Sequence, residues 1–420
     1  MNHLKAHIVA LAQWIATGAI VGLCCGAASA LFLYLLQLAT DYRTAHEVII
    51  YALPVAGLVV GTLYARFGSS IKGGNNLVID TIHDDGPEIP LRMAPMVLAG
   101  TVLTHLFGGS AGREGTAVQM GASLTDWLSH RAKLPRHLRR VLLAAGVAGG
   151  FGSVFGTPIA GAVFGLEFVV LGRIEYRALV PALVAAVVGD YTTRALGIVH
   201  IAYPTAPHVA LDPLLCAKWL AFAVAVTATS IAFIELTHVI KKRGETLIPH
   251  LGLRMALGGA IVVGMWKLVG TSDYLGLGVP TIVQSFTGHV APYAFALKLV
   301  FTAVTLGAGF LGGEVTPLFF IGAALGAVLG PLLGIPPELA AGVGLAAVFA
   351  SASKTPLALS IMAVELLGAN VLPHVVIVSV IAYVLTGRRS IYPSQLRHVT
   401  AGKAASSPQH DEMAPPPPAP

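Results

Sequence analysis

Long runs of apolar residues dominate the chain, and short polar or glycine-rich breaks separate them. The longest runs cover residues 8–40, 141–171 and 211–240, whereas those near 94–108 and 115–128 are short and interrupted by glycine. Each long run exceeds the roughly 20 apolar residues that an α-helix needs to cross a bilayer. Short, broken runs are typical of helices that end inside a membrane. The pattern therefore predicts an all-α polytopic membrane protein in which several helices are discontinuous.

Composition and charge agree with this class. Charged residues make up 11% of the chain and the mean hydropathy is +0.77, whereas soluble domains carry about 25% charged residues. Aromatic residues are few and strand-like alternation is weak, which disfavours an outer-membrane barrel. The net charge of +6 lies largely in short loops at 131–140, 241–243 and 388–397. The positive-inside rule places these loops in the cytoplasm and the segment 197–211 outside, so no nucleic-acid partner is expected.

The chain contains a weak internal repeat. Residues 148–171 resemble residues 346–369, and residues 112–124 resemble residues 313–325, so both matches lie about 200 positions apart. Such repeats are typical of transporters with a site near the middle of the membrane. We predict one transport domain over residues 1–399, with halves at about 8–200 and 211–398. The Pro-rich tail at 400–420 is expected to be disordered.

Three glycine-rich stretches, at 72–77, 108–116 and 312–317, each precede an apolar helix. Glycine allows the backbone to approach a ligand closely, and the helix N-terminus then offers unpaired N–H groups and the positive end of a dipole. Several such ends would hold an anion without a full positive charge. Alternatively, the glycines are small residues at helix contacts.

Two glutamates occur in this apolar context, where an ionisable group is costly and usually functional. Glu114 lies in the second glycine-rich stretch, between apolar runs, and Glu314 is the only charged residue between Leu299 and Pro337. A carboxylate at a helix N-terminus can occupy an anion site and leave it when protonated, which would couple anion and proton movement. The structural alternative is a permanent partner, either Arg113 or the helix dipole for Glu114.

Other polar residues in apolar segments are expected to have structural roles. Glu167 and Glu365 occupy equivalent repeat positions and are interpreted as helix-end or helix-contact residues. Lys298 and Lys354 are expected to reach the membrane surface or to pair with carboxylates. His105 is a candidate proton relay, although packing is the preferred interpretation.

Several motifs of metal, nucleotide or haem enzymes are absent: the chain has no HExxH, P-loop or haem CxxCH sequence. We therefore expect no enzymatic activity, no cofactor and no metal. An intramembrane enzyme with dispersed catalytic residues remains the alternative from a different class.

Together, the glycine-rich stretches, the 155–161 segment (FGTPIAG) and the tyrosine after the last apolar run resemble the CLC family of anion channels and proton-coupled anion antiporters. The resemblance extends from about residue 10 to about residue 398. It implies a homodimer in the membrane lipid, with one pore in each subunit and tilted, discontinuous helices in two inverted repeats. It also implies that Glu114 is the gating glutamate and that Tyr392 approaches the anion path from inside.

Departures from the chloride-transporting members are informative. Asn75 replaces a serine, Thr116 replaces a proline after the gating motif, and the polar segment 314–316 (EVT) replaces an apolar one. Phe168 stands where chloride/proton antiporters have their inner proton glutamate, with Glu167 one residue before it. This combination resembles the bacterial fluoride/proton antiporter branch.

The resemblance implies export of fluoride from the cytoplasm by exchange with protons, in the cytoplasmic (inner) membrane. Chloride/proton antiport and passive anion conduction are the alternatives within the family. Glu114 is expected to gate and to transfer protons, and Glu314 is the candidate second proton group. The expected anion-binding residues are Asn75, Gly112, Arg113, Gly115, Thr116, Val315, Thr316 and Tyr392.

Overall fold

The computed structural model describes residues 2–83, 88–169 and 174–395, and within these ranges the protein is built from helices. Six of the described helical segments are long and apolar enough to cross a membrane. The prediction of an all-α polytopic fold is confirmed. The expected tail at 400–420 lies outside the described residues.

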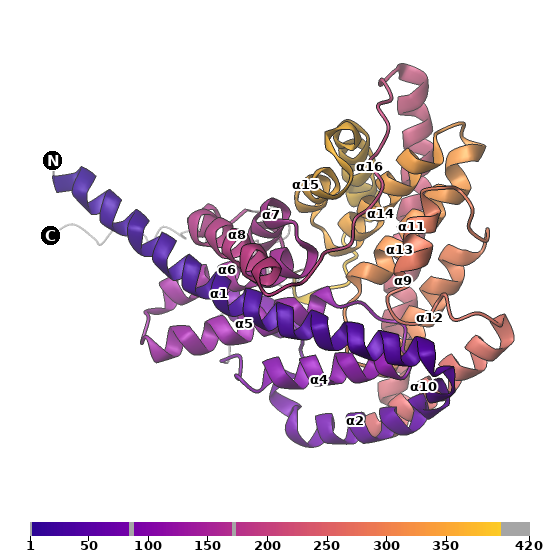
Figure 1. Ribbon diagram of the computed structural model, residues 1–420, viewed down its shortest axis with the longest axis horizontal. Coiled ribbons are helices and arrows are strands. Elements are labelled where there is room, and N and C mark those ends of the chain that lie inside the picture. The colour runs from indigo at the N-terminus through magenta and orange to yellow at the C-terminus, as the bar shows by residue number, and fades with distance from the viewer. Residues whose placement is uncertain (1, 84–87, 170–173, 396–420) are drawn as a thin grey trace, which may run out of the picture.

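Within the described residues, each half of the chain contains eight α-helices. The first half contains α1 (Asn2–Ala45), α2 (Leu53–Phe67), α3 (Asn75–His83), α4 (Met93–Leu106), α5 (Glu114–Arg131), α6 (Arg136–Phe155), α7 (Pro158–Glu167) and α8 (Leu179–Ala195). The second half contains α9 (Pro213–Leu247), α10 (Leu251–Val269), α11 (Val279–Ser285), α12 (Ala294–Ala308), α13 (Val315–Leu332), α14 (Pro337–Ser353), α15 (Pro356–Leu367) and α16 (Leu372–Leu385). Short 3-10 turns at Glu47–Ala52, Ser69–Ile71, Tyr176–Ala178 and Ala369–Val371 join some of them. In Figure 1 the long α1 runs diagonally across the first half, with α6, α7 and α8 above it and α4 and α2 below it.

The apolar run 141–171 does not form one helix. Helix α6 ends at Phe155, where Gly156 adopts a left-handed φ of 75°, and α7 begins at Pro158. Glycine tolerates the left-handed conformation, and proline fits the first turn of a helix because its missing N–H would have no partner there. The break therefore divides this long apolar run into α6 and the short helix α7. Short helices were expected from the glycine-interrupted runs elsewhere in the chain, but not here.

Helices α7 and α15 show how the two halves are related. The Glu167 carboxylate, at the end of α7, accepts hydrogen bonds from Leu357 N (3.2 Å) and Ala358 N (2.8 Å) at the start of α15. The equivalent Glu365 of α15 accepts hydrogen bonds from Ile159 N (3.0 Å) and Ala160 N (2.7 Å) at the start of α7.

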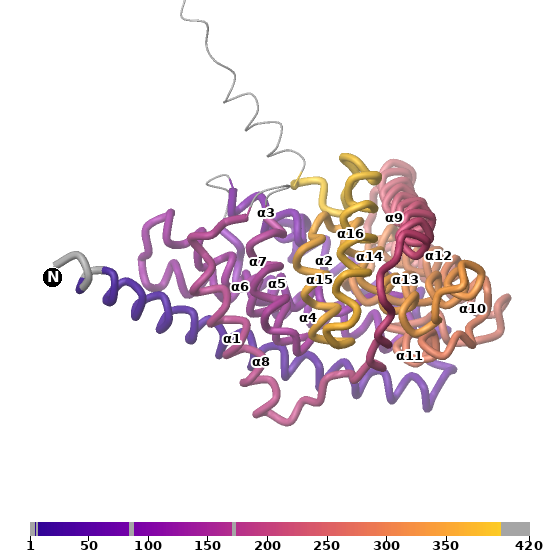
Figure 2. The backbone as a smooth tube through the Cα atoms, turned by 90° about the horizontal axis from the view of Figure 1, so that it is seen from above, coloured from indigo at the N-terminus to yellow at the C-terminus, as the bar shows by residue number. Residues whose placement is uncertain are grey.

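Each of these two helices therefore ends where the other begins, so they are antiparallel, and both views show them side by side (Figures 1 and 2). Antiparallel orientation of equivalent helices is the geometry of inverted repeats. The interpretation of Glu167 and Glu365 as helix-contact residues is confirmed.

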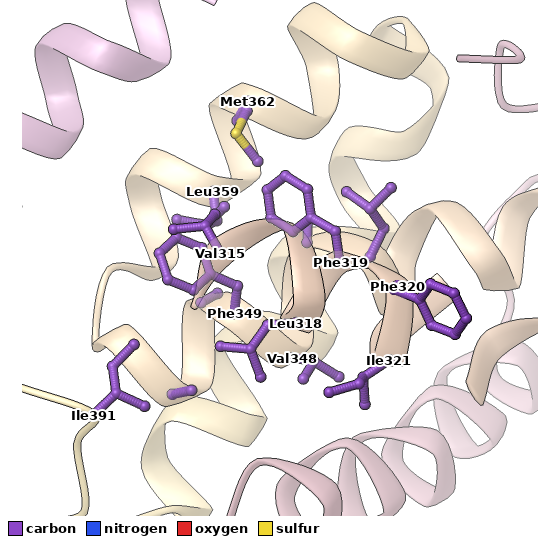
Figure 3. Packing of buried hydrophobic residues seen from close by; sticks show 14 of the residues in the cluster. Val315, Leu318, Phe319, Phe320, Ile321, Val348, Phe349, Leu359, Met362 and Ile391 are labelled. Carbon is purple, nitrogen blue, oxygen red and sulfur yellow. The ribbon is translucent and has the colours of Figure 1, made fainter. Parts of the chain in front are cut away.

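A continuous apolar core fixes the start of α13. Figure 3 shows Val315 and Leu318 beside Phe349 of α14, with Leu359 and Met362 of α15 above them. All five side chains are buried. Because packed interiors leave little room for side chains to shift, this core holds the first turn of α13 in a defined position.

Candidate functional site

The two repeat-related loops meet at a pair of glycines. Gly112 and Gly313 form an antiparallel bridge in which each N–H donates to the carbonyl of the other, at 2.6 and 2.9 Å. A Cβ at Gly112 would lie 2.9 Å from Gly313 O, and one at Gly313 would lie 2.7 Å from Gly115 N. Only glycine permits this approach. The bridge thus brings the starts of α5 and α13 together.

The carboxylate of Glu114 lies at this junction and is fully buried. Its Oε2 accepts hydrogen bonds from Thr316 N and Arg113 N, both at 3.1 Å. Its Oε1 accepts a hydrogen bond from the Thr316 hydroxyl and contacts Arg113 Nε at 3.4 Å. The carboxylate is therefore held by backbone and side-chain donors from both halves.

The first turn of a helix has unpaired N–H groups and the positive end of the helix dipole, so it stabilises a negative charge. Glu114 is the first residue of α5, and its carboxylate also lies at the start of α13. The two expected partners, Arg113 and the dipole of α5, are thus both present. The start of α13 provides further donors through Thr316. A small anion could be held by the same donors when the carboxylate moves away.

Asn75, Glu314 and Gly115 surround a second position beside the first. A Cβ on residue 115 would lie 3.1 Å from Asn75 Nδ2 and 3.6 Å from Glu314 Oε2. Asn75 lines the same cavity as the buried Tyr392. Asn75 Oδ1 and Glu314 Oε2 are buried, and neither has a hydrogen-bond partner within the described ranges. Because buried polar atoms are normally paired, this space is suited to a small polar ligand or a proton.

The two remaining predicted residues are placed differently. The Thr116 hydroxyl is hydrogen-bonded to the Thr101 hydroxyl at 2.7 Å. The Val315 side chain belongs to the apolar core, so it could contact an anion only through its backbone.

A cavity of about 610 Å³ leads to this second position. Asn75, Thr116, Glu314 and Tyr392 are among its lining residues, and we call the part of the cavity that they line its inner end. We call it the vestibule. Its other lining residues include four cations that the sequence analysis did not connect, namely Lys72, Lys241, Lys242 and Arg254. Lys72 is far in the sequence from the other three, and only the position of these cations at the edges of apolar runs could have indicated them. Lys241 and Pro393 line the same cavity, and the basic residues at 241–243, which were expected in a loop, lie in α9.

Lys298 and Lys354 were expected to reach the membrane surface or to pair with carboxylates, and this prediction was wrong. Lys298 Nζ donates to Tyr274 O (3.1 Å) and Gly276 O (2.7 Å), and Lys354 Nζ donates to Tyr383 O (2.9 Å). Both side chains are buried and have backbone carbonyls, not carboxylates, as partners. Tyr274 and Gly276 lie in a loop and Tyr383 lies in the last turn of α16, and carbonyl oxygens at such places have no partner within a helix, so a buried ammonium group can satisfy them.

His105 and Phe168 are also buried. Both ring nitrogens of His105 contact backbone carbonyls, those of Thr101 (2.9 Å) and Ala111 (3.0 Å), which favours the packing interpretation. The Phe168 ring packs edge-on against Tyr392, with centroids 5.0 Å apart. Phe168 therefore fills its position with an apolar ring next to the predicted anion path.

Inverted halves, broken helices and a buried carboxylate at converging helix ends define a membrane transport protein. The chain belongs to the voltage gated chloride channel family, the CLC family, whose model matches residues 56–387. The resemblance seen in the sequence is thereby confirmed. The protein is a multi-pass membrane protein of this family.

Known relatives cover most of the chain. It is 47% identical to a chloride/fluoride channel protein of Pseudomonas syringae pv. tomato, over 92% of this chain and 86% of that protein. A crystal structure of a CLC-type fluoride/proton antiporter matches with a TM-score of 0.89 and 37% identity, over 92% of this chain and 98% of the other. A slow cyanobacterial Cl⁻/H⁺ antiporter shares the fold, with a TM-score of 0.81 and 20% identity over 93% and 99% of the two chains.

Proposed function

We propose that this protein is a fluoride/proton antiporter that exports fluoride from the cytoplasm in exchange for protons. The observation that carries the proposal is the buried Glu114 carboxylate, which accepts hydrogen bonds from the hydroxyl and the N–H of Thr316 at the start of α13. The named activities of the relative and of the antiporter structure support the same function.

Glu114 acts as the gate and as a proton carrier. As a carboxylate it occupies the donors that an anion requires, and once protonated it loses most of its attraction to them and can leave. Fluoride then takes these donors. Because the same group takes up a proton and vacates the site, anion and proton movement are coupled.

Glu314 is the second proton group in this proposal. It lines the vestibule, and its buried Oε2 has no partner in the described segments. The usual inner position is occupied by the apolar ring of Phe168, which cannot exchange a proton. A proton arriving through the vestibule therefore meets Glu314 before it meets Glu114.

Fluoride selectivity rests on hydrogen-bond donors. Fluoride is small and strongly hydrated, so a site that removes its water must supply donors in return. The proposed donors are the Asn75 amide, the Thr316 hydroxyl and the backbone N–H groups of Arg113 and Gly115. Gly112 contributes through the backbone bridge to Gly313, in which its own N–H is already used. The remaining residues proposed to lie along the anion path are Thr116, Val315 and Tyr392.

The proposal includes a homodimer in the cytoplasmic (inner) membrane. Helices α7 and α15 present apolar side chains at equivalent outward positions, where Ile159 and Leu357 are each nearly half exposed. Two such faces would bury apolar area against each other in a dimer.

The test is transport in proteoliposomes with a fluoride electrode and a pH electrode recording together. Antiport predicts fluoride efflux accompanied by proton uptake, and a fluoride gradient that drives protons uphill. Chloride efflux at a similar rate would favour a chloride/proton antiporter. Fluoride efflux without proton movement would favour a passive channel, and turnover of a chemical substrate without either flux would favour an enzyme.

A further inference from the structure

Cationic side chains outnumber carboxylates among the residues that line the vestibule. Lys72 precedes α3, Lys241 and Lys242 belong to the last turns of α9, and Arg254 lies on α10. Three separate segments thus bring four cations to one cavity. Apart from Glu314 at the inner end, the carboxylate among its lining residues is that of Glu245, which is 3.9 Å from Arg254.

The vestibule is also large for a single fluoride ion. At about 610 Å³ it has the volume of a small-molecule site. Its wall contains the Thr237 hydroxyl, which is buried and has no hydrogen-bond partner among the described residues. Cations from three segments together with an unused hydroxyl donor match the chemistry of an oxyanion with more than one negative charge.

The inner end of the vestibule is the part that transport requires. Asn75 and Tyr392 close it, and the charge of Lys241 acts on the Glu314 carboxyl. An anion held by Lys241 would therefore occupy the route of fluoride and offset the field that Lys241 exerts at Glu314.

We propose that the vestibule binds a soluble multivalent oxyanion of the pyrophosphate or nucleoside polyphosphate class, and that this anion blocks transport from the vestibule side. This inference rests on the proposed anion transport for its effect, but not for the binding itself. A soluble ligand fits better than a lipid headgroup, because the cavity ends at buried residues of the anion path.

The test uses pyrophosphate in magnesium-free buffer on proteoliposomes made from neutral lipid. Protein inserts in both orientations, so external pyrophosphate should remove about half of the fluoride efflux, and pyrophosphate on both sides should remove nearly all of it. The Lys241→Gln/Lys242→Gln variant should need at least tenfold more pyrophosphate for half inhibition, each flux being normalised to the uninhibited rate of that variant.

The matched control is Arg131→Gln/Lys133→Gln, which removes two exposed cations that do not line the vestibule. It should be inhibited like the wild type. Calorimetric titration of the purified protein with pyrophosphate measures binding even if fluoride flux is absent, so failure of the proposed function is recognised separately.

Three results would overturn the inference: no heat of binding together with uninhibited flux, equal inhibition of both double variants, or inhibition only when anionic phosphatidylglycerol is added to the vesicles. The first would mean that the cations serve only to attract fluoride.

Discussion

Replacing Asn75 by serine tests the basis of selectivity. Asn75 Nδ2 lies 3.1 Å from the point that a Cβ on Gly115 would occupy, beside the proposed path. Serine is shorter and carries a hydroxyl in place of the amide, so the donor is lost or displaced. A hydrogen bond to a charged group is worth about 1.5–3 kcal/mol, which corresponds to roughly a tenfold to hundredfold change in preference.

The structural alternative is that Asn75 only caps the helix that follows it, a role that serine performs equally well. The structure disfavours this alternative, because Asn75 Oδ1 has no hydrogen-bond partner within the described ranges. We therefore expect Asn75→Ser to lower the preference for fluoride over chloride by about ten- to hundredfold, measured as the ratio of the two efflux rates from proteoliposomes.

The neighbouring Asn76 provides the control. Its Oδ1 accepts a hydrogen bond from Ser394 N at 3.0 Å, so it has a structural partner. Asn76→Ser should affect stability more than selectivity. An unchanged ratio in Asn75→Ser, or an equal loss of preference in both variants, would refute the assigned role of Asn75.

The other predictions concern three glutamates and the tail. Glu114→Gln should abolish fluoride-driven proton movement, since an amide cannot exchange a proton, and persistent pumping in the pH-electrode assay would contradict this. Glu314→Ala should also reduce the number of protons moved per fluoride, and normal coupling would remove Glu314 from its role. Glu365→Ala should lower stability by about 0.5–2 kcal/mol through loss of a helix cap, measured by thermal unfolding in detergent; an unchanged unfolding temperature would contradict it. Truncation after residue 400 should leave efflux intact, and a large loss would show that the tail is structural.

The helical class and the position of the candidate site follow from local sequence features. Apolar runs identify membrane helices because length and hydropathy are local properties. The glycine-rich stretches predict the starts of α3, α5 and α13, because glycine followed by a polar residue and an apolar run is a local signal for a helix start. The repeat then indicates that two of these starts are equivalent.

Contacts between distant segments could not be predicted in this way. Glu167 and Glu365 each cap the helix of the other half, but the sequence shows only that both are repeat equivalents. Lys298 was expected to find a carboxylate, and its partners are loop carbonyls that no motif marks. The four vestibule cations likewise come together only in the folded chain, where α9, α10 and the segment before α3 line one cavity.

The choice of donors at Glu114 explains why an inverted repeat suits anion exchange. A transported ion must bind well enough to enter a site and weakly enough to leave it. Apart from the Arg113 guanidinium at 3.4 Å, the donors to Glu114 are two backbone N–H groups and one hydroxyl. Neutral donors attract a carboxylate or fluoride without the full charge of a buried ammonium group, so either can be released. One helix start offers too few such donors, and the Gly112–Gly313 bridge supplies the second start at the same place.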